Sequence, residues 1–254
     1  MLPIWRSKFE LKPGTWVFVP TEQSIKDGKV IKLAINKFWK PPKNYFHLRA
    51  GGHIKALESH LNSSNFVHLD IQNFFGSINK TRVTRCLKGL FSYADARAMA
   101  NISTVINPGE KNLILPFGFV QSPILASLCL SKSALGRCIH ELPKKYPDLL
   151  VSVYVDDIIL SANDEANLQK AMLEVKQCAK RSGFDLNATK EEGPAPKITA
   201  FNIELTKLSL EIEPARYAEF ISAFAESVNL FQREGIRSYI NSVNPGQAVK
   251  LMPV

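Results

Sequence analysis

Apolar residues gather in several short segments of the chain, and acidic residues interrupt two of these segments. Residues 151–161 read Val-Ser-Val-Tyr-Val-Asp-Asp-Ile-Ile-Leu-Ser. β-Branched and aromatic residues favour strands, whereas Asp is a poor strand former and a common turn residue. The pattern therefore predicts a β-hairpin with Asp156 and Asp157 at its tip.

A second apolar run carries a carboxylate in an unusual position. Residues 66–75 read Phe-Val-His-Leu-Asp-Ile-Gln-Asn-Phe-Phe, which predicts a strand at 66–71 with Asp70 near its end. Burying an unpaired carboxylate costs several kcal/mol, so Asp70 requires a metal ion or another cation. An acidic pair alone is most often a solvated turn, but three aspartates at two strand ends favour a Mg²⁺ or Mn²⁺ site. Such sites hold two ions about 4 Å apart and serve phosphoryl transfer.

Four blocks of sequence resemble the reverse transcriptase family. Residues 154–157, Tyr-Val-Asp-Asp, are similar to its Tyr-x-Asp-Asp signature, and Asp70 matches its first catalytic aspartate. Residues 115–127, Leu-Pro-Phe-Gly-Phe-Val-Gln-Ser-Pro-Ile-Leu-Ala-Ser, resemble its Leu-Pro-x-Gly turn followed by Ser-Pro and a helix. Residues 183–190, Gly-Phe-Asp-Leu-Asn-Ala-Thr-Lys, resemble the palm segment that ends in lysine. The form of residues 117–123 is most similar to bacterial abortive-infection and defence-associated enzymes, with retron and group II intron enzymes more distant.

The resemblance implies roles for individual residues. The implied metal ligands are Asp70, Ile71, Asp156 and Asp157. The three aspartates are also implied to be catalytic, together with Lys190, which would donate a proton to the leaving pyrophosphate. For Lys190, a solvated lysine after a turn is an equally simple interpretation.

A second implied set of residues binds the nucleotide: Arg49, Phe75, Phe117, Gly118 and Gln121. Phe75 matches the aromatic gate under the incoming sugar, where a ring would clash with a 2′-hydroxyl and so favour deoxynucleotides. The planar fork of Arg49 suits a phosphate. The chain departs from the common pattern at Phe117, where many relatives carry glutamine, and at Gln121, where many carry glycine or a small residue.

The implied fold is α+β, a right-hand polymerase with fingers, palm and a short helical thumb. We expect basic fingers over 1–65, a palm over 66–205 and a thumb-like tail over 206–254. The elements that hydrophobic periodicity predicts are a strand at 15–20, a helical region at 79–102, a helix after Pro123, a helix at about 165–182, a strand at 198–206, and helices at about 214–230 and 234–243.

Charge agrees with a nucleic-acid partner. The chain has 32 Lys and Arg against 23 Asp and Glu, a net charge of +9, and residues 1–65 alone hold 11 against 4. A basic amino-terminal third predicts a face that follows a phosphate backbone. The sequence contains no apolar run long enough to predict a membrane span or a secretory signal. We therefore expect a cytoplasmic location and no membrane partner.

The sequence therefore predicts an RNA-directed DNA polymerase that extends a 3′-hydroxyl with deoxynucleoside triphosphates and Mg²⁺ or Mn²⁺, in bacterial antiphage defence. Its expected partners are an RNA template, which includes a dedicated non-coding RNA as one option, and the DNA product. Because the thumb is short, an accessory protein or a homo-oligomer is expected to complete the channel. The alternatives are a template-independent or protein-primed polymerase, with Tyr217 or Tyr239 as the freer primers, and a non-enzymatic RNA-binding subunit.

Overall fold

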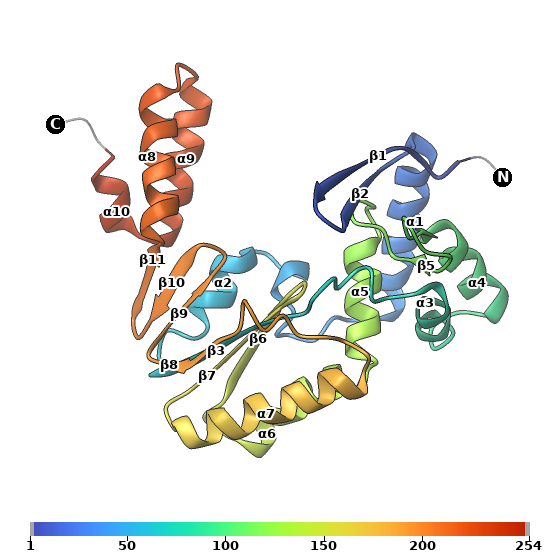
Figure 1. Ribbon diagram of the computed structural model, residues 1–254, viewed down its shortest axis with the longest axis horizontal. Coiled ribbons are helices and arrows are strands. Elements are labelled where there is room, and N and C mark those ends of the chain that lie inside the picture. The colour runs from blue at the N-terminus through green and yellow to red at the C-terminus, as the bar shows by residue number, and fades with distance from the viewer. Residues whose placement is uncertain (1–2, 252–254) are drawn as a thin grey trace.

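A four-stranded antiparallel sheet lies at the centre of the computed structural model, which describes residues 3–251 (Figure 1). The strand order is β6-β7-β3-β8. The strands are β6 (Leu150–Tyr154), β7 (Asp157–Ala162), β3 (Asn65–Asp70) and β8 (Glu192–Ala195). The hairpin expected at 151–161 and the strand expected at 66–71 are confirmed, and they are neighbours in this sheet.

Each face of this central sheet is covered by a different part of the chain. Successive residues of a strand point to opposite faces, and accordingly Val67 and Phe66 of β3 belong to two different hydrophobic clusters. The first cluster includes buried residues of α6 (Ala134–Lys145) and α7 (Glu165–Arg181), which Figure 1 shows side by side on one face. The second includes Leu57 of α2 (Gly52–Glu58), on the opposite face.

The amino-terminal part of the chain and the segment after β3 form a separate lobe beside the sheet (Figure 1). Its elements are β1 (Trp5–Lys12), β2 (Thr15–Pro20), α1 (Glu22–Phe38), α3 (Lys80–Leu87), α4 (Tyr93–Ile102), β4 (Val105–Ile106), β5 (Leu113–Ile114) and α5 (Ser122–Ser131), with the 3₁₀ turn η1 (Phe46–Leu48) linking it to α2. The strand expected at 15–20 is confirmed, and it pairs with β1. The helical region expected at 79–102 contains two helices, because Ser92 caps a new helix by accepting from the Asp95 N–H.

The carboxyl-terminal part differs from the predicted elements. The strand expected at 198–206 is two strands, β9 (Lys197–Ala200) and β10 (Ile203–Thr206), which pair with β11 (Ser209–Ile212) in one sheet. The chain reverses between β9 and β10 at Phe201 and Asn202, whose φ angles are 58° and 59°. Two consecutive left-handed residues are typical of a tight hairpin turn.

Three helices follow this sheet: α8 (Pro214–Glu226), α9 (Leu230–Val243) and α10 (Pro245–Val249). The helix expected to begin at about 234 begins four residues earlier, at Leu230, because Asn229 caps it. Pro245 follows α9 and is the first residue of α10. Proline is tolerated there because the N–H of the first helical residue has no partner within the helix. Within residues 3–251, none of the helices is both long enough and apolar enough to cross a membrane.

Candidate active site

The register of the central sheet brings the predicted carboxylates together. Asp70 ends β3 and Asp157 begins β7, and the two residues are direct partners across the strands. Asp156 lies in the turn between β6 and β7, where its carbonyl oxygen accepts a 2.9 Å hydrogen bond from the Ile71 N–H. Asp70 and the adjacent pair Asp156 and Asp157, which follows 86 residues later in the chain, therefore lie together at one end of the sheet's inner strands.

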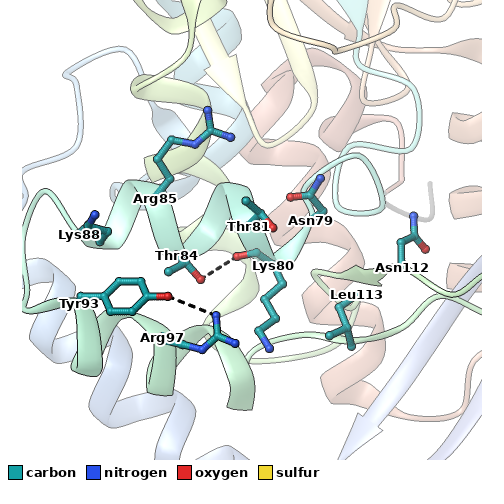
Figure 2. Close-up of a pocket in the computed structure, with 10 residues that line it drawn as sticks. All are labelled: Asn79, Lys80, Thr81, Thr84, Arg85, Lys88, Tyr93, Arg97, Asn112 and Leu113. Atoms are coloured by element: carbon teal, nitrogen blue, oxygen red, sulfur yellow. Dashed lines mark hydrogen bonds between the residues drawn. The ribbon is translucent and has the colours of Figure 1, made fainter.

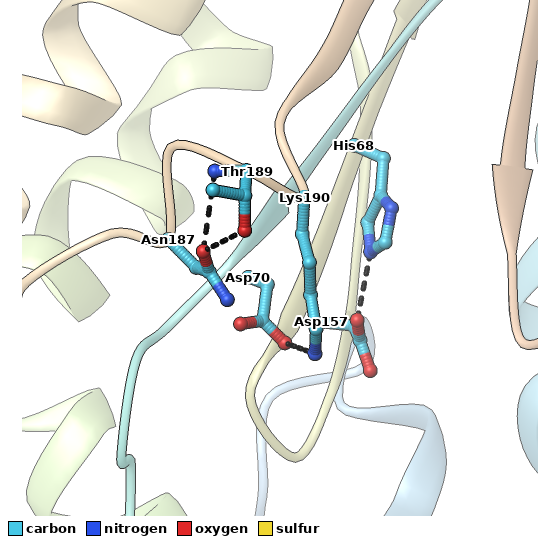
Figure 3. A network of polar contacts seen from close by, with 6 residues as sticks. All are labelled: His68, Asp70, Asp157, Asn187, Thr189 and Lys190. Atoms are coloured by element: carbon cyan, nitrogen blue, oxygen red, sulfur yellow. Dashed lines mark hydrogen bonds and ion pairs between the residues drawn. The ribbon is translucent and has the colours of Figure 1, made fainter.

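Asp70 is held in an ion pair with Lys190. The ammonium of Lys190 lies 2.7 Å from Asp70 Oδ2, and the Asp70 side chain is only 5% exposed whereas that of Lys190 is 49% exposed (Figure 3). This hydrogen bond, with the charge of Asp70, raises the pKa of Lys190 above its usual value. The loop before Lys190 is fixed to the same strand end, because the Asn187 N–H donates to the Asp70 carbonyl at 2.9 Å.

Asp157 has a different partner. Its Oδ1 lies 2.7 Å from Nε2 of His68, a buried residue two positions before Asp70 on β3 (Figure 3). The other ring nitrogen of His68 has no hydrogen-bond partner among the described residues. The imidazole therefore orients one oxygen of Asp157 and leaves the second oxygen free to face the cavity.

Asp156 is the electrostatically strained member of the group. Burial is the main cause that raises the pKa of Asp156 to about 6, and the charge of Asp157 adds to it. A raised carboxyl pKa in a crowded acidic site indicates a deficit of positive charge.

A divalent cation fits this donor set. Among residues 3–251, no group of three or more His, Cys, Asp or Glu side chains is arranged to hold a metal ion, and Asp70 and Asp157 contact Lys190 and His68. Mg²⁺ commonly takes only one or two protein carboxylates and completes its shell with water and substrate phosphates. Asp70 and Asp156, with the Ile71 carbonyl beside them, offer such a set.

A series of hydrogen bonds that could not be predicted from the sequence holds the turn between β6 and β7. Val155 has a φ of 59°, which is costly for a β-branched residue. Its N–H donates to His47 Nδ1 at 2.9 Å, and His47 Nε2 lies 2.6 Å from Ser127 Oγ, which donates to the Pro123 carbonyl. Burial lowers the pKa of His47 to about 4. The ring is thus neutral, with Nδ1 accepting and Nε2–H donating.

A cavity of about 650 Å³ lies over these groups. The predicted site residues that line it are Asp70, Ile71, Phe75, Phe117, Asp156, Asp157 and Lys190. The rings of Phe75 and Phe117 meet edge to face with centroids 5.6 Å apart. A space of this volume, with apolar rings opposite carboxylates and an ammonium, has the character of a small-ligand site.

Gly118 lies outside the cavity lining but positions the backbone of Phe117, which lines it. Its φ is 108°, and an added Cβ would overlap the carbonyl oxygen of Phe18 on β2. The same contact includes a 2.9 Å hydrogen bond from the Phe18 N–H to the Phe117 carbonyl. Glycine at this position therefore lets the 117–118 turn approach β2 and fixes the backbone of Phe117.

Two residues that the sequence assigned to the nucleotide lie outside the cavity lining. The guanidinium of Arg49 donates to the Lys43 carbonyl and lies over the Phe46 ring. Gln121 is fully buried, and its amide contacts Ser103 Oγ at 3.3 Å. Neither side chain lines the cavity, so neither is placed to contact a nucleotide bound there.

The sequence of residues 25–199 matches the family model described as reverse transcriptase (RNA-dependent DNA polymerase). The chain belongs to the reverse transcriptase family. Its α+β fold is similar to that of Candida albicans telomerase in complex with a TWJ fragment of telomeric RNA, with a TM-score of 0.58 and 12% identity over 90% of this chain. It is also similar to a foamy viral protease–reverse transcriptase in complex with double-stranded DNA, with a TM-score of 0.51 and 17% identity over 91% of this chain. The chain spans 46% and 34% of these two structures' own chains. The prediction of a polymerase fold within this family is confirmed.

Proposed function

We propose that the chain is an RNA-directed DNA polymerase that adds deoxynucleotides to a primer 3′-hydroxyl. The observation that carries the proposal is the convergence of Asp70, Asp156, Asp157 and Lys190 in one cavity beside Phe75. Three crowded carboxylates, an ammonium and an aromatic wall are groups that suit a nucleoside triphosphate and a divalent cation. In this proposal residues 1–65 are the fingers, 66–205 the palm and 206–254 the thumb.

In the proposed reaction, the primer 3′-oxygen bonds to the α-phosphorus, and the bond from that phosphorus to the pyrophosphate oxygen breaks. Divalent ions bound by Asp70 and Asp156 would stabilise charge on the attacking and leaving oxygens. The hydroxyl proton passes to solvent. Lys190 is protonated and half exposed at the cavity wall, so it is placed to give its proton to the leaving pyrophosphate.

Phe75 supplies the proposed choice of sugar. Its ring is only partly buried, lines the cavity, and is braced edge to face against Phe117. A fixed ring under the sugar leaves no room for a 2′-hydroxyl. Discrimination against ribonucleotides would therefore be steric and would not depend on a hydrogen bond.

Nucleic acid is the proposed macromolecular partner. The two structural neighbours were solved with RNA and with DNA, and the net charge of this chain is +9. We infer an RNA template, with a dedicated non-coding RNA as one form of it, and a DNA product. The two helices α8 and α9 form a small thumb, so an accessory protein or a second copy would complete the channel. The proposed role in bacterial antiphage defence follows from the resemblance of residues 117–123, and the proposed cytoplasmic location follows from the sequence expectation given above.

Protein priming gains no support from the tail tyrosines. The Tyr217 hydroxyl donates to the Gln247 carbonyl at 2.7 Å, and the Tyr239 hydroxyl lies 3.3 Å from His53 Nε2. Both side chains are partly buried. The expectation that they are free primers is therefore not met in this conformation.

The test is incorporation of labelled deoxynucleotides by the purified protein with Mg²⁺ or Mn²⁺, before and after ribonuclease treatment. We expect synthesis that ribonuclease abolishes and that Asp156→Asn abolishes. Asp185→Asn is the matched control, because Asp185 is an exposed aspartate outside the cavity. Synthesis that survives ribonuclease would support the untemplated alternative. Full activity in Asp156→Asn would refute the proposed catalytic site.

A further inference from the structure

A second hollow, of about 640 Å³, lies between α3, α4 and β5 (Figure 2). Four cationic side chains line it: Lys80, Arg85, Lys88 and Arg97. The remaining described lining residues are neutral, and none is acidic. Lys80 and Arg85 lie on the short helix α3, and Lys88 is its C-cap residue. The hollow thus concentrates positive charge on the lobe that lies beside the central sheet.

These cations have no counter-charges. Within residues 3–251, none of the four makes an ion pair with an acidic side chain. Arg85, Lys88 and Arg97 are exposed and Lys80 is half-buried. Positive groups collected in a concave surface raise the local concentration of anions. The hollow is therefore suited to a ligand with several negative charges.

An exposed aromatic ring lies among the cations. Tyr93, at the start of α4, is 56% exposed. The ammonium of Lys88 lies 5.4 Å from its ring centroid, and Arg97 donates to its hydroxyl at 3.4 Å (Figure 2). An exposed ring between cations is the arrangement on which a base stacks while its neighbouring phosphates are neutralised. A free anion such as phosphate would use the cations but would have no use for the ring.

The hollow is separated from the catalytic cavity by one short strand. Leu113 of β5 lines the hollow, and its neighbour Ile114 lines the catalytic cavity. Adjacent residues of a strand point to opposite sides. A polynucleotide that leaves the catalytic cavity around β5 would therefore meet Lys80 and Tyr93 next.

We propose that this hollow binds a single-stranded segment of nucleic acid, with its phosphates on the four cations and one base on Tyr93. That the bound strand is the one that enters or leaves the polymerase centre rests on the proposed function. The binding itself does not, and it is measured without synthesis.

The experiment measures binding of a fluorescent single-stranded RNA, the same sequence as DNA, and a blunt duplex, by anisotropy at low and moderate salt. The variant Arg85→Gln/Lys88→Gln is compared with Lys180→Gln/Arg181→Gln. The control pair removes the same charge from the exposed carboxyl-terminal end of α7, whose residues do not line the hollow. Loss of two phosphate contacts to a single strand should lower the slope of log affinity against log salt by about 1.4.

Tyr93→Ala separates stacking from charge. We expect single-strand affinity to fall by about fivefold or more with an unchanged salt slope, because stacking of a base on an aromatic ring is not ionic. Weaker binding of RNA alone, or of RNA and DNA alike, supports the site. Affinity equal to that of the parent, a loss matched by the α7 control, or duplex binding that alone depends on the hollow would overturn it.

The outcome is independent of catalysis. Each comparison is repeated with Asp156→Asn, which we expect to bind single strands as the parent does. If no variant synthesises DNA but the Arg85/Lys88 pair still weakens binding, the polymerase proposal fails and the binding site stands. If synthesis is normal and binding is unaffected, the binding site fails alone.

Discussion

Replacing Asp156 by asparagine should stabilise the metal-free protein although it destroys the proposed catalytic site. Asparagine keeps the size of the side chain and removes its charge. Burial and the charge of Asp157 raise the pKa of Asp156 from 3.8 to about 6 in the folded state. The shift of about two units corresponds to about 3 kcal/mol, at about 1.4 kcal/mol per unit.

The sign of this effect follows from proton binding. Between pH 3.8 and about pH 6 the folded state holds the Asp156 proton more tightly than the unfolded state does. The stabilisation is therefore fully present below the lower value and is lost as the pH rises through the upper one. The gain from Asp156→Asn should be near zero in acid and should reach about 3 kcal/mol above neutrality.

The assay is urea unfolding followed by circular dichroism, with chelator, at an acidic and at a slightly alkaline pH. Asp185→Asn serves as the control for loss of a carboxylate. Excess Mg²⁺ should then stabilise the parent and have little effect on Asp156→Asn, because the ion relieves the same repulsion that the substitution removes. If Asp156→Asn is no more stable than the parent at alkaline pH, or if its gain does not depend on pH, the carboxylate is not electrostatically strained.

Three further changes test other parts of the site. His47→Ala leaves the Val155 N–H without its buried partner, at a cost of about 1–3 kcal/mol, so steady-state incorporation should fall by about tenfold or more. His47→Asn keeps an acceptor near the position of Nδ1 and should retain most activity. Equal rates for the two variants would contradict this role of His47. Phe75→Val should raise ribonucleotide use relative to deoxynucleotide use by at least about tenfold, and an unchanged ratio of kcat/KM would exclude Phe75 as the gate. Gly118→Ala should lower the free energy of unfolding by about 2 kcal/mol or more, because φ is positive at this position and the new Cβ would overlap the Phe18 carbonyl oxygen. A urea unfolding midpoint equal to that of the parent would contradict this prediction.

The three aspartates that we propose as catalytic could be predicted from the sequence because their signal is local. A carboxylate inside a strand-like apolar run is unusual wherever it occurs, and two such runs predict two strand ends. That Asp70 and Asp157 are direct partners follows from the antiparallel register, which the sequence does not state. Lys190 was predicted as a site residue only by the family resemblance, and the structure places its ammonium 2.7 Å from Asp70 Oδ2.

The features that could not be predicted from the sequence depend on distant packing or on weak turn signals. Gln121 is buried because α1, far earlier in the chain, packs on it closely at Gly28, where a Cβ would overlap the Gln121 side chain. His47 had no ligand spacing and no periodicity around it, yet it supports the turn that carries Asp156. The turn at Phe201 and Asn202 lacks the glycine that usually marks such a reversal, although Asn202 was a weak signal for it.

Asp70 cannot keep its bond to Lys190 and also serve a divalent cation with the same oxygen. In the metal-free conformation the ammonium of Lys190 supplies the positive charge that a carboxylate 5% exposed requires. If Asp70 bound a cation, Lys190 would lose its partner, but the backbone bonds from Lys190 to the Asn187 carbonyl and from Asn187 to the Asp70 carbonyl would still hold its position. The tether would keep the released ammonium within the cavity, beside the charges of Asp157 and Asp156 and at the proposed site of the triphosphate. The ion pair and the proposed proton donor are thus two positions of one side chain, and its exposure of 49% leaves room for both.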